Sequence, residues 1–176
     1  MARSPPVAPR SNDDTMTASV STFPLADTNI NPLTGLATDY LNHFNEAIML
    51  LEMLAETPDC RSDFFAWQPR NYSEHFAASS FKHREIAIAA YAAADPERRQ
   101  RLNTLADTMN EILMATREVM RQPLSAASAG MIAHLALRWI KPLVAQAGAV
   151  INGIQTECVP EPENAPQAAV DAVLAR

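Results

Sequence analysis

The sequence is poor in glycine and contains no strand pattern. Only 4 of its 176 residues are glycine, and no segment alternates polar and apolar residues with the period of two that a half-buried strand requires. Apolar residues recur instead at steps of three and four along most of the chain. This spacing predicts an all-α fold.

Cysteine is scarce and long apolar runs are missing. Cys60 and Cys158 are too far apart for a Cys-x-x-Cys metal or redox motif, so free thiols are expected. Arg138 and Lys141 interrupt the most apolar stretch, which leaves charge-free runs shorter than the roughly 18 residues of a membrane span. Neither a secretory leader nor a lipidation motif is evident. We therefore predict a cytoplasmic protein with no membrane span.

The charge balance argues against nucleic-acid binding. The net charge is −6, whereas polyanions are held chiefly by Lys and Arg. The one dense basic run, Arg98, Arg99 and Arg101, has no interleaved aromatic residue and is interpreted as a solvated face.

Composition divides the chain into three parts. Residues 1–30 are rich in Pro, Ser, Thr, Asn and Asp and are predicted to be a disordered leader, in which Met16 is an alternative start to Met1. Residues 31–155 are predicted to form one domain. Residues 156–176 are predicted to be a flexible tail, with a short terminal helix as the alternative and docking on the domain left open.

Four helices are predicted within the domain, at 32–57, 72–94, 96–121 and 125–155. Asn31, Asp95 and Ser125 are suitable N-caps for three of them, and Pro142 predicts a kink in the last. Because the links between the later helices are short, the expected arrangement is an antiparallel up-down-up-down four-helix bundle.

The last predicted helix carries more apolar surface than one bundle core requires. A helical projection places Ile132, Leu135 and Trp139 on the core face. The second apolar face predicts a self-association interface, and a homodimer is the commonest such assembly. The residues of this predicted interface are Leu137, Ile140, Val144 and Ile151.

The segment before the second helix is rich in aromatic residues. Phe64, Phe65 and Trp67 lie within four positions. They predict an aromatic lid over one end of the bundle, and the alternative is contact with a ligand or partner, where aromatic anchors are enriched.

Metal binding is the sharpest chemical hypothesis, because bundle cores often hold metals on histidine and carboxylate side chains. The candidates are His83, His43, Asp39 and Glu46. No Glu-x-x-His or His-Glu-x-x-His motif supports them. A packed core histidine, bonded to Ser79, Ser80 or a backbone carbonyl, is the preferred interpretation of His83, and no cofactor is expected.

Histidine phosphotransfer is a second alternative. His134 is followed by Arg138 and Lys141 at helical spacing, and His75 offers a weaker version. The Leu-Lys-Gly that usually follows the phosphorylated histidine is missing at both positions.

Nothing in the sequence predicts catalysis. Neither cysteine has an adjacent histidine, and no Gly-x-Ser-x-Gly or glycine-rich phosphate loop occurs. The sequence resembles no family that we recognise, and it names no ligand, partner or pathway. The expected function is protein or ligand binding by a small helical bundle, with a metal or small-ligand site near His83 and His43 as the main alternative.

Overall fold

The computed structural model describes residues 29–56 and 61–154, which are predominantly helical and contain no strand. An isolated antiparallel bridge joins Ile30 and Ala37. A 3-10 turn at Thr38–Tyr40 follows it. Residues 1–28 of the predicted leader, which include Met16, lie outside the described residues, as do the predicted tail, Cys60 and Cys158. Ile30, at the end of that predicted leader, is buried. The α-helices are α1 (Leu41–Glu56), α2 (Arg61–Ala66), α3 (Tyr72–Ala78), α4 (Arg84–Ala93), α5 (Pro96–Met120) and α6 (Ala126–Ile151).

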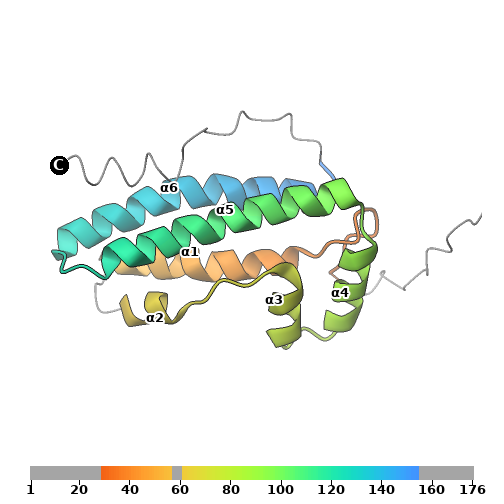
Figure 1. The fold of residues 1–176 in the computed structure, drawn as a ribbon, viewed down its shortest axis with the longest axis horizontal. Helices are drawn as coiled ribbons and strands as arrows, with labels where there is room; N and C mark the ends of the chain where they lie inside the picture. Colours follow the sequence, from red (N-terminus) through yellow and green to blue (C-terminus); the bar gives the residue numbers. More distant parts are fainter. Residues whose placement is uncertain (1–28, 57–60, 155–176) are drawn as a thin grey trace, which may run out of the picture.

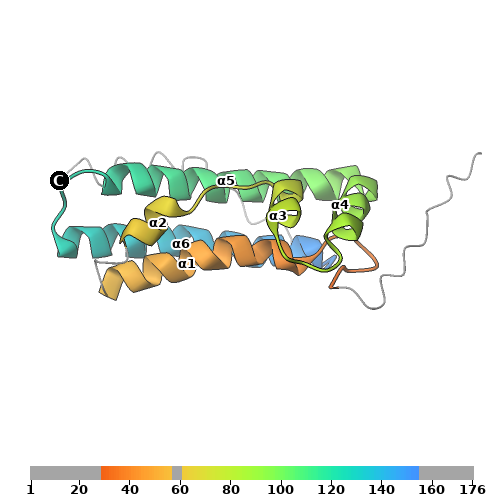
Figure 2. The same cartoon turned by 90° about the horizontal axis from the view of Figure 1, so that it is seen from below.

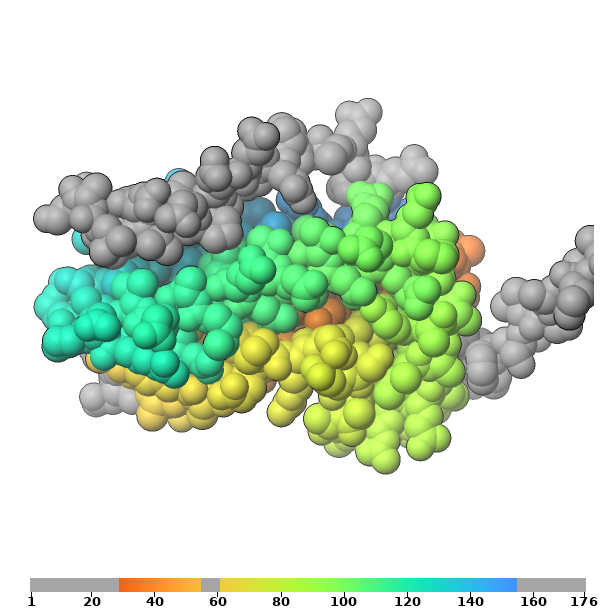
Figure 3. All heavy atoms as spheres, viewed as in Figure 1, coloured from red at the N-terminus to blue at the C-terminus, as the bar shows by residue number. Residues whose placement is uncertain are grey.

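The three longest helices form the body of the molecule. Helix α6 packs against both α1 and α5, and the three lie lengthwise beside one another in both ribbon views (Figures 1 and 2). A short link at residues 121–125 lets α6 return along α5. The shorter helices α2 and α3 lie over α1 on the face shown in Figure 3, and α4 packs against α3 at one end of the molecule. Among the described residues, no helix is long and apolar enough to cross a membrane.

Local capping signals set the starts of several helices. The Asp95 carboxylate accepts a hydrogen bond from the Arg98 amide at 2.8 Å, and Pro96 follows at the first helical position. The Ser125 hydroxyl accepts one from the Ser128 amide at 3.1 Å. At α3, Asn71 and Glu74 exchange side-chain-to-backbone bonds of 2.9 Å each, which completes a capping box.

The helix predicted at 72–94 is not continuous. Helix α3 ends at Ala78 and α4 begins at Arg84. The Ser79 hydroxyl donates to the Phe76 carbonyl at 2.9 Å and accepts from the Phe81 amide at 3.3 Å. Serine thus offers the backbone an alternative to helical bonding, and the chain turns there. The described residues therefore do not form four continuous long helices.

The first long helix begins later than predicted. Asn31 caps a tight turn, not a helix, because its carbonyl accepts the Gly35 amide at 2.8 Å and its side chain accepts the Leu33 amide at 2.9 Å. Gly35 then adopts a φ of +70°, which favours glycine. A Cβ at Gly35 would lie 3.0 Å from the Ala90 carbonyl oxygen. This turn fits closely against α4, and α1 starts only at Leu41.

Part of the outward apolar face predicted for the last helix is buried within the chain. Leu137, Ile140 and Ile151 were expected on an outward surface, but the structure buries all three inside the chain. Trp139, expected in the core, is only partly buried. The buried side also carries small residues, which let α1 and α5 approach closely. These small residues are Ala129, Gly130, Ala133, Ala136 and Ala147. Helix α6 continues through Pro142 as one helix.

Candidate functional site beside His43

A pocket of about 430 Å³ lies where α1 meets α2 and the segment that follows α2. Helix α2 lies beside the later half of α1, and residues 67–71 run back along α1 toward α3 (Figures 1 and 2). The lining of the pocket combines charged, polar, apolar and aromatic side chains, namely His43, Glu46, Leu50, Asp63, Ala66, Trp67, Gln68 and Arg70.

His43 is the most unusual residue of this lining. Its side chain is only 4% exposed, and its ring stacks on Trp67 with centroids 4.6 Å apart and planes inclined by 23°. Burial lowers the pKa of His43 to about 4, and the electrostatic effects of His75 and Arg70 act in the same direction. The imidazole is therefore neutral at pH 7. Its Nε2 atom is buried and makes no hydrogen bond within the described chain, which is uncommon for a buried polar atom.

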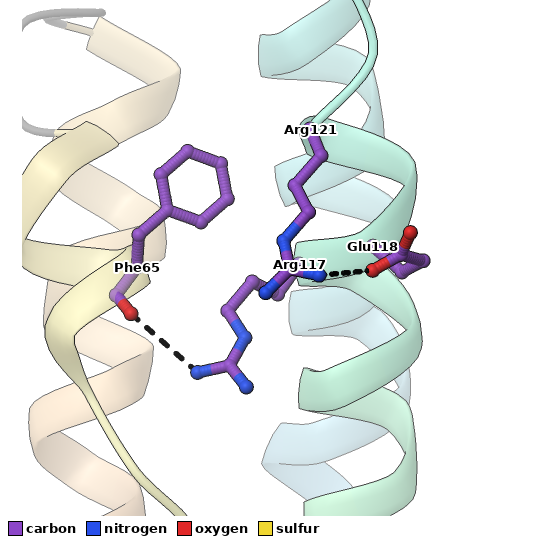
Figure 4. Close-up of polar contacts among 4 residues, drawn as sticks. All are labelled: Phe65, Arg117, Glu118 and Arg121. Atoms are coloured by element: carbon purple, nitrogen blue, oxygen red, sulfur yellow. Dashed lines mark hydrogen bonds and ion pairs between the residues drawn. The ribbon is translucent and has the colours of Figure 1, made fainter.

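Trp67 is fixed by hydrogen bonds on three sides. Its indole Nε1 donates to the His43 carbonyl at 3.2 Å, and its amide donates to the Asp63 carbonyl at 3.1 Å. Its own carbonyl accepts from Arg117 Nη1 at 2.8 Å. Arg117 is 7% exposed and also reaches the Phe65 carbonyl at 3.5 Å (Figure 4). A buried guanidinium from α5 thus holds this wall of the pocket in place.

The other wall is held by tyrosines. The Tyr40 hydroxyl donates to the Arg70 carbonyl at 3.0 Å, and the Tyr72 hydroxyl accepts from the Ala37 amide at 2.9 Å. His75 packs edge-on against Tyr40 at 5.6 Å and lies 5.8 Å from His43. Burial and Arg70 lower the pKa of His75, although Asp39 and Glu46 act in the opposite direction. The two histidines therefore share one electrostatic environment.

Three charged side chains of the lining form no ion pair with one another. Within the described residues the ion pairs are Glu118–Arg121 and Glu52–Lys141, both 2.7 Å long. Glu46, Asp63 and Arg70 belong to neither, and all three are exposed. Their charges remain available to a molecule in the pocket.

Comparison with known proteins gives no match. No protein-family model, no curated protein and no solved structure is similar to this chain. The site must therefore be interpreted from its own geometry.

The residues predicted as metal candidates are only partly brought together. His43 and Glu46 line the pocket, and Asp39 contributes a backbone hydrogen bond to His75. His83, expected in the core, instead precedes α4, is half-buried, and makes no capping bond. The break at Ser79 moves it away from the predicted face. In the described ranges no three His, Cys, Asp or Glu side chains are grouped to hold a metal ion.

The phosphotransfer candidates lie in two different environments. His134 and Arg138 are exposed on α6 beside a shallow pocket of about 600 Å³, and Lys141 there is paired with Glu52. His75 is half-buried among aromatic rings and does not present an open imidazole.

The aromatic segment packs against the core of the protein. Phe64 is buried and Trp67 is 7% exposed, whereas Phe65 is partly buried. Trp67 is packed into the core and also lines the pocket, and contact of this segment with a ligand or partner stays a prediction.

Sequence analysis missed Arg117 and Tyr40, which hold the pocket walls. Arg117 lies on the same helical side as Leu113, four residues before it, and Met120, three residues after it, and all three are buried. A cation within such an apolar stripe was the available signal. Tyr40 lies four residues before Phe44, and both are buried, but the sequence analysis assigned Tyr40 no role within the helix predicted at 32–57.

Proposed function

We propose that this protein acts by binding a small polar molecule in the pocket beside His43, without catalysing a reaction. The observation that carries this proposal is a 96% buried histidine that lines a pocket of about 430 Å³ and whose Nε2 atom has no hydrogen-bond partner among the described residues. Ligand sites commonly have volumes of about 300–1,000 Å³ and combine apolar walls with a few polar groups.

The fixed walls support binding. Arg117 and Tyr40 hold the carbonyls of Trp67 and Arg70 from two different elements. A site that is already ordered loses less conformational entropy when a ligand enters. The pocket is therefore suited to a ligand without large rearrangement of its walls.

The same geometry gives little support to general base catalysis. A general base works best when its pKa lies near the working pH, and the pKa of His43 is about 4. Its role is better described as a neutral hydrogen-bonding group for a ligand.

Trp67 provides a direct test. The chain has two tryptophans, so Trp139→Phe leaves Trp67 as the only indole reporter. Small amines, carboxylates, amino acids and polyols are titrated into this variant while its fluorescence and melting temperature are followed. Binding is expected to change the Trp67 emission and to raise the melting temperature by mass action.

Two substitutions of the same kind provide the control. Ala66 lines the pocket and is exposed, whereas Ala92 is exposed on α4 away from it. Ala66→Phe is expected to abolish the response and Ala92→Phe to preserve it. The proposal fails if no compound class changes the Trp67 signal, or if both variants respond like the parent.

Protein binding is the second candidate. Met49 is 52% exposed and Met53 is 43% exposed, one turn apart on α1, and exposed methionines adapt to varied partner surfaces. The homodimer stays a prediction, and α1 is a better surface for it than α6. Light scattering on Met49→Lys with Met53→Lys checks this, because a dimer through α1 would dissociate.

Two further predictions belong to this proposal. We propose that α2, the 67–71 segment and α3 take the place of the second helix in an antiparallel four-helix arrangement. A cytoplasmic location fits a binding role and stays a prediction. Fractionation of cells that express the full chain tests it.

A further inference from the structure

We infer that the pocket beside His43 binds a small zwitterion with one ammonium and one carboxylate, the chemical class of the free amino acids. This inference rests on the proposed binding function and adds the class of ligand. It is carried by the charged residues of the lining, which have both signs and form no ion pair within the described part of the chain, together with the Nε2 atom of His43, which has no hydrogen-bond partner there.

Arg70 is the group for the carboxylate. Its planar guanidinium matches a carboxylate in two parallel hydrogen bonds. Its backbone is held by the Tyr40 hydroxyl at 3.0 Å, and its charge reaches both His43 and His75, whose pKa values it lowers. The anionic end of the ligand therefore lies near the histidines.

Glu46 and Asp63 are the groups for the ammonium. Glu46 comes from α1 and Asp63 from the first turn of α2, so the two approach the pocket from different elements. With Arg70 the lining carries two negative charges and one positive charge. A purely anionic ligand would meet the repulsion of both carboxylates, and a purely cationic ligand would leave Arg70 without a partner.

Between these charges the lining is apolar or neutral. Leu50, Ala66 and the Trp67 ring offer apolar contact for a short side chain. His43 is neutral at pH 7 and Gln68 is an amide, so both can hydrogen bond without adding charge. An amino acid with a small or medium side chain satisfies each of these groups.

The test compares matched probes in the Trp139→Phe protein. The standard free amino acids are titrated first. Leucine is then compared with 3-methylbutylamine, which lacks the carboxylate, and with 4-methylpentanoate, which lacks the ammonium. The best amino acid is compared in the same way with its own amine and carboxylate analogues. We expect the best amino acid to bind about tenfold or more tightly than either analogue, because charged hydrogen bonds are lost.

Variants assign the two ends. Arg70→Gln should bring the affinity for the amino acid down to that for the amine, and Glu46→Gln with Asp63→Asn should bring it down to that for the carboxylate. Arg121→Gln and Glu111→Gln, which change exposed charges outside the pocket lining, should leave the affinities unchanged.

The outcomes separate the two proposals. If a singly charged or uncharged compound binds as tightly as the best amino acid, or if only another compound class binds, the zwitterion inference is overturned and the binding function stands. If no compound of any class changes the Trp67 signal, the binding function itself fails.

Discussion

Arg117 and Arg121 are one turn apart on α5, yet their surroundings are opposite. Arg117 is buried and donates to carbonyls of Phe65 and Trp67, whereas Arg121 is exposed and pairs with the exposed Glu118 at 2.7 Å (Figure 4). A buried charged donor contributes more than an exposed ion pair, because solvent screens the exposed pair and desolvation isolates the buried carbonyls.

Replacement of each arginine by methionine measures this difference. Arg117→Met should lower the free energy of unfolding by about 1–3 kcal/mol, because it leaves the Trp67 carbonyl without its donor. Arg121→Met should change it by about 0.5 kcal/mol or less. Urea unfolding provides the measurement. Equal effects of the two substitutions would contradict the role given to Arg117.

His43 predicts a dependence of stability on pH. Its folded pKa is about 4 and its ordinary value is 6.5, so between these values the unfolded chain binds a proton that the folded chain does not. The contribution of His43 to the free energy of unfolding is fully present above pH 6.5 and decreases as the pH drops toward 4. Below pH 4 it no longer changes. The loss amounts to as much as about 3 kcal/mol.

Replacement of His43 by glutamine isolates its contribution to the pH dependence of stability. In His43→Gln, the decline in the free energy of unfolding between pH 6.5 and pH 4 should be smaller than in the parent. Urea unfolding at pH 7, 5.5 and 4.5 makes the comparison. If the parent and His43→Gln lose stability in parallel, the pKa of His43 is not the cause.

The burial of His43 could not be predicted from its own helix. The sequence singled out His43 only as a candidate metal ligand. It becomes buried because Trp67 stacks on it and His75 approaches it from α3. Both contacts depend on the path of the chain between α2 and α3, for which the sequence offered only a cluster of aromatic residues.

At the scale of elements, local signals were sufficient where capping decides the structure. Asp95, followed by Pro96, sets the start of α5, and Ser125 sets the start of α6. Each side chain accepts a hydrogen bond from the amide three residues later. The direction of the α6 faces depends on two neighbouring helices at once. A projection that weights large side chains selected Trp139, whereas close packing on both sides selects the side with alanines.

Replacement of two glycines by alanine is predicted to change the stability of the protein in opposite directions. Gly35→Ala should destabilise the protein by about 1–3 kcal/mol, because Gly35 has a φ of +70° and an added Cβ meets the Ala90 carbonyl oxygen at 3.0 Å. Gly148→Ala lies inside α6, where the nearest atom is Leu41 Cδ1 at 3.6 Å. It should stabilise by as much as about 1 kcal/mol. Thermal unfolding checks both, and two changes of the same sign would refute this account.

At the scale of the whole molecule, the loop before α1 is joined to the end of α6. The Thr34 hydroxyl donates to the Ile151 carbonyl at 2.6 Å, across 117 positions of the sequence. Arg98 Nη1 donates to the adjacent Val150 carbonyl at 3.1 Å. Helix α6 has no basic residue in its last turn, so these distant side chains satisfy carbonyls that a helix leaves open at its end.

Contacts between distant residues usually form late in folding, because a long loop must close first. Thr34→Val removes the hydroxyl with little change of shape and should lower the free energy of unfolding by about 1–2 kcal/mol. Most of this change should appear as faster unfolding, with the folding rate nearly constant. Stopped-flow kinetics would show it, and a slower folding rate would place this contact in the transition state.

The same junction brings the two ends of the described core together. Domains whose ends are adjacent tolerate circular permutation. The order of the helices along the chain is then not essential to their packing. A permuted chain in which Arg176 continues into Met1, and which opens between the exposed residues Gln122 and Pro123, would be translated with α6 first and α5 last. It would still place Thr34 beside Ile151, so the helices could assemble in the same positions from a different genetic order.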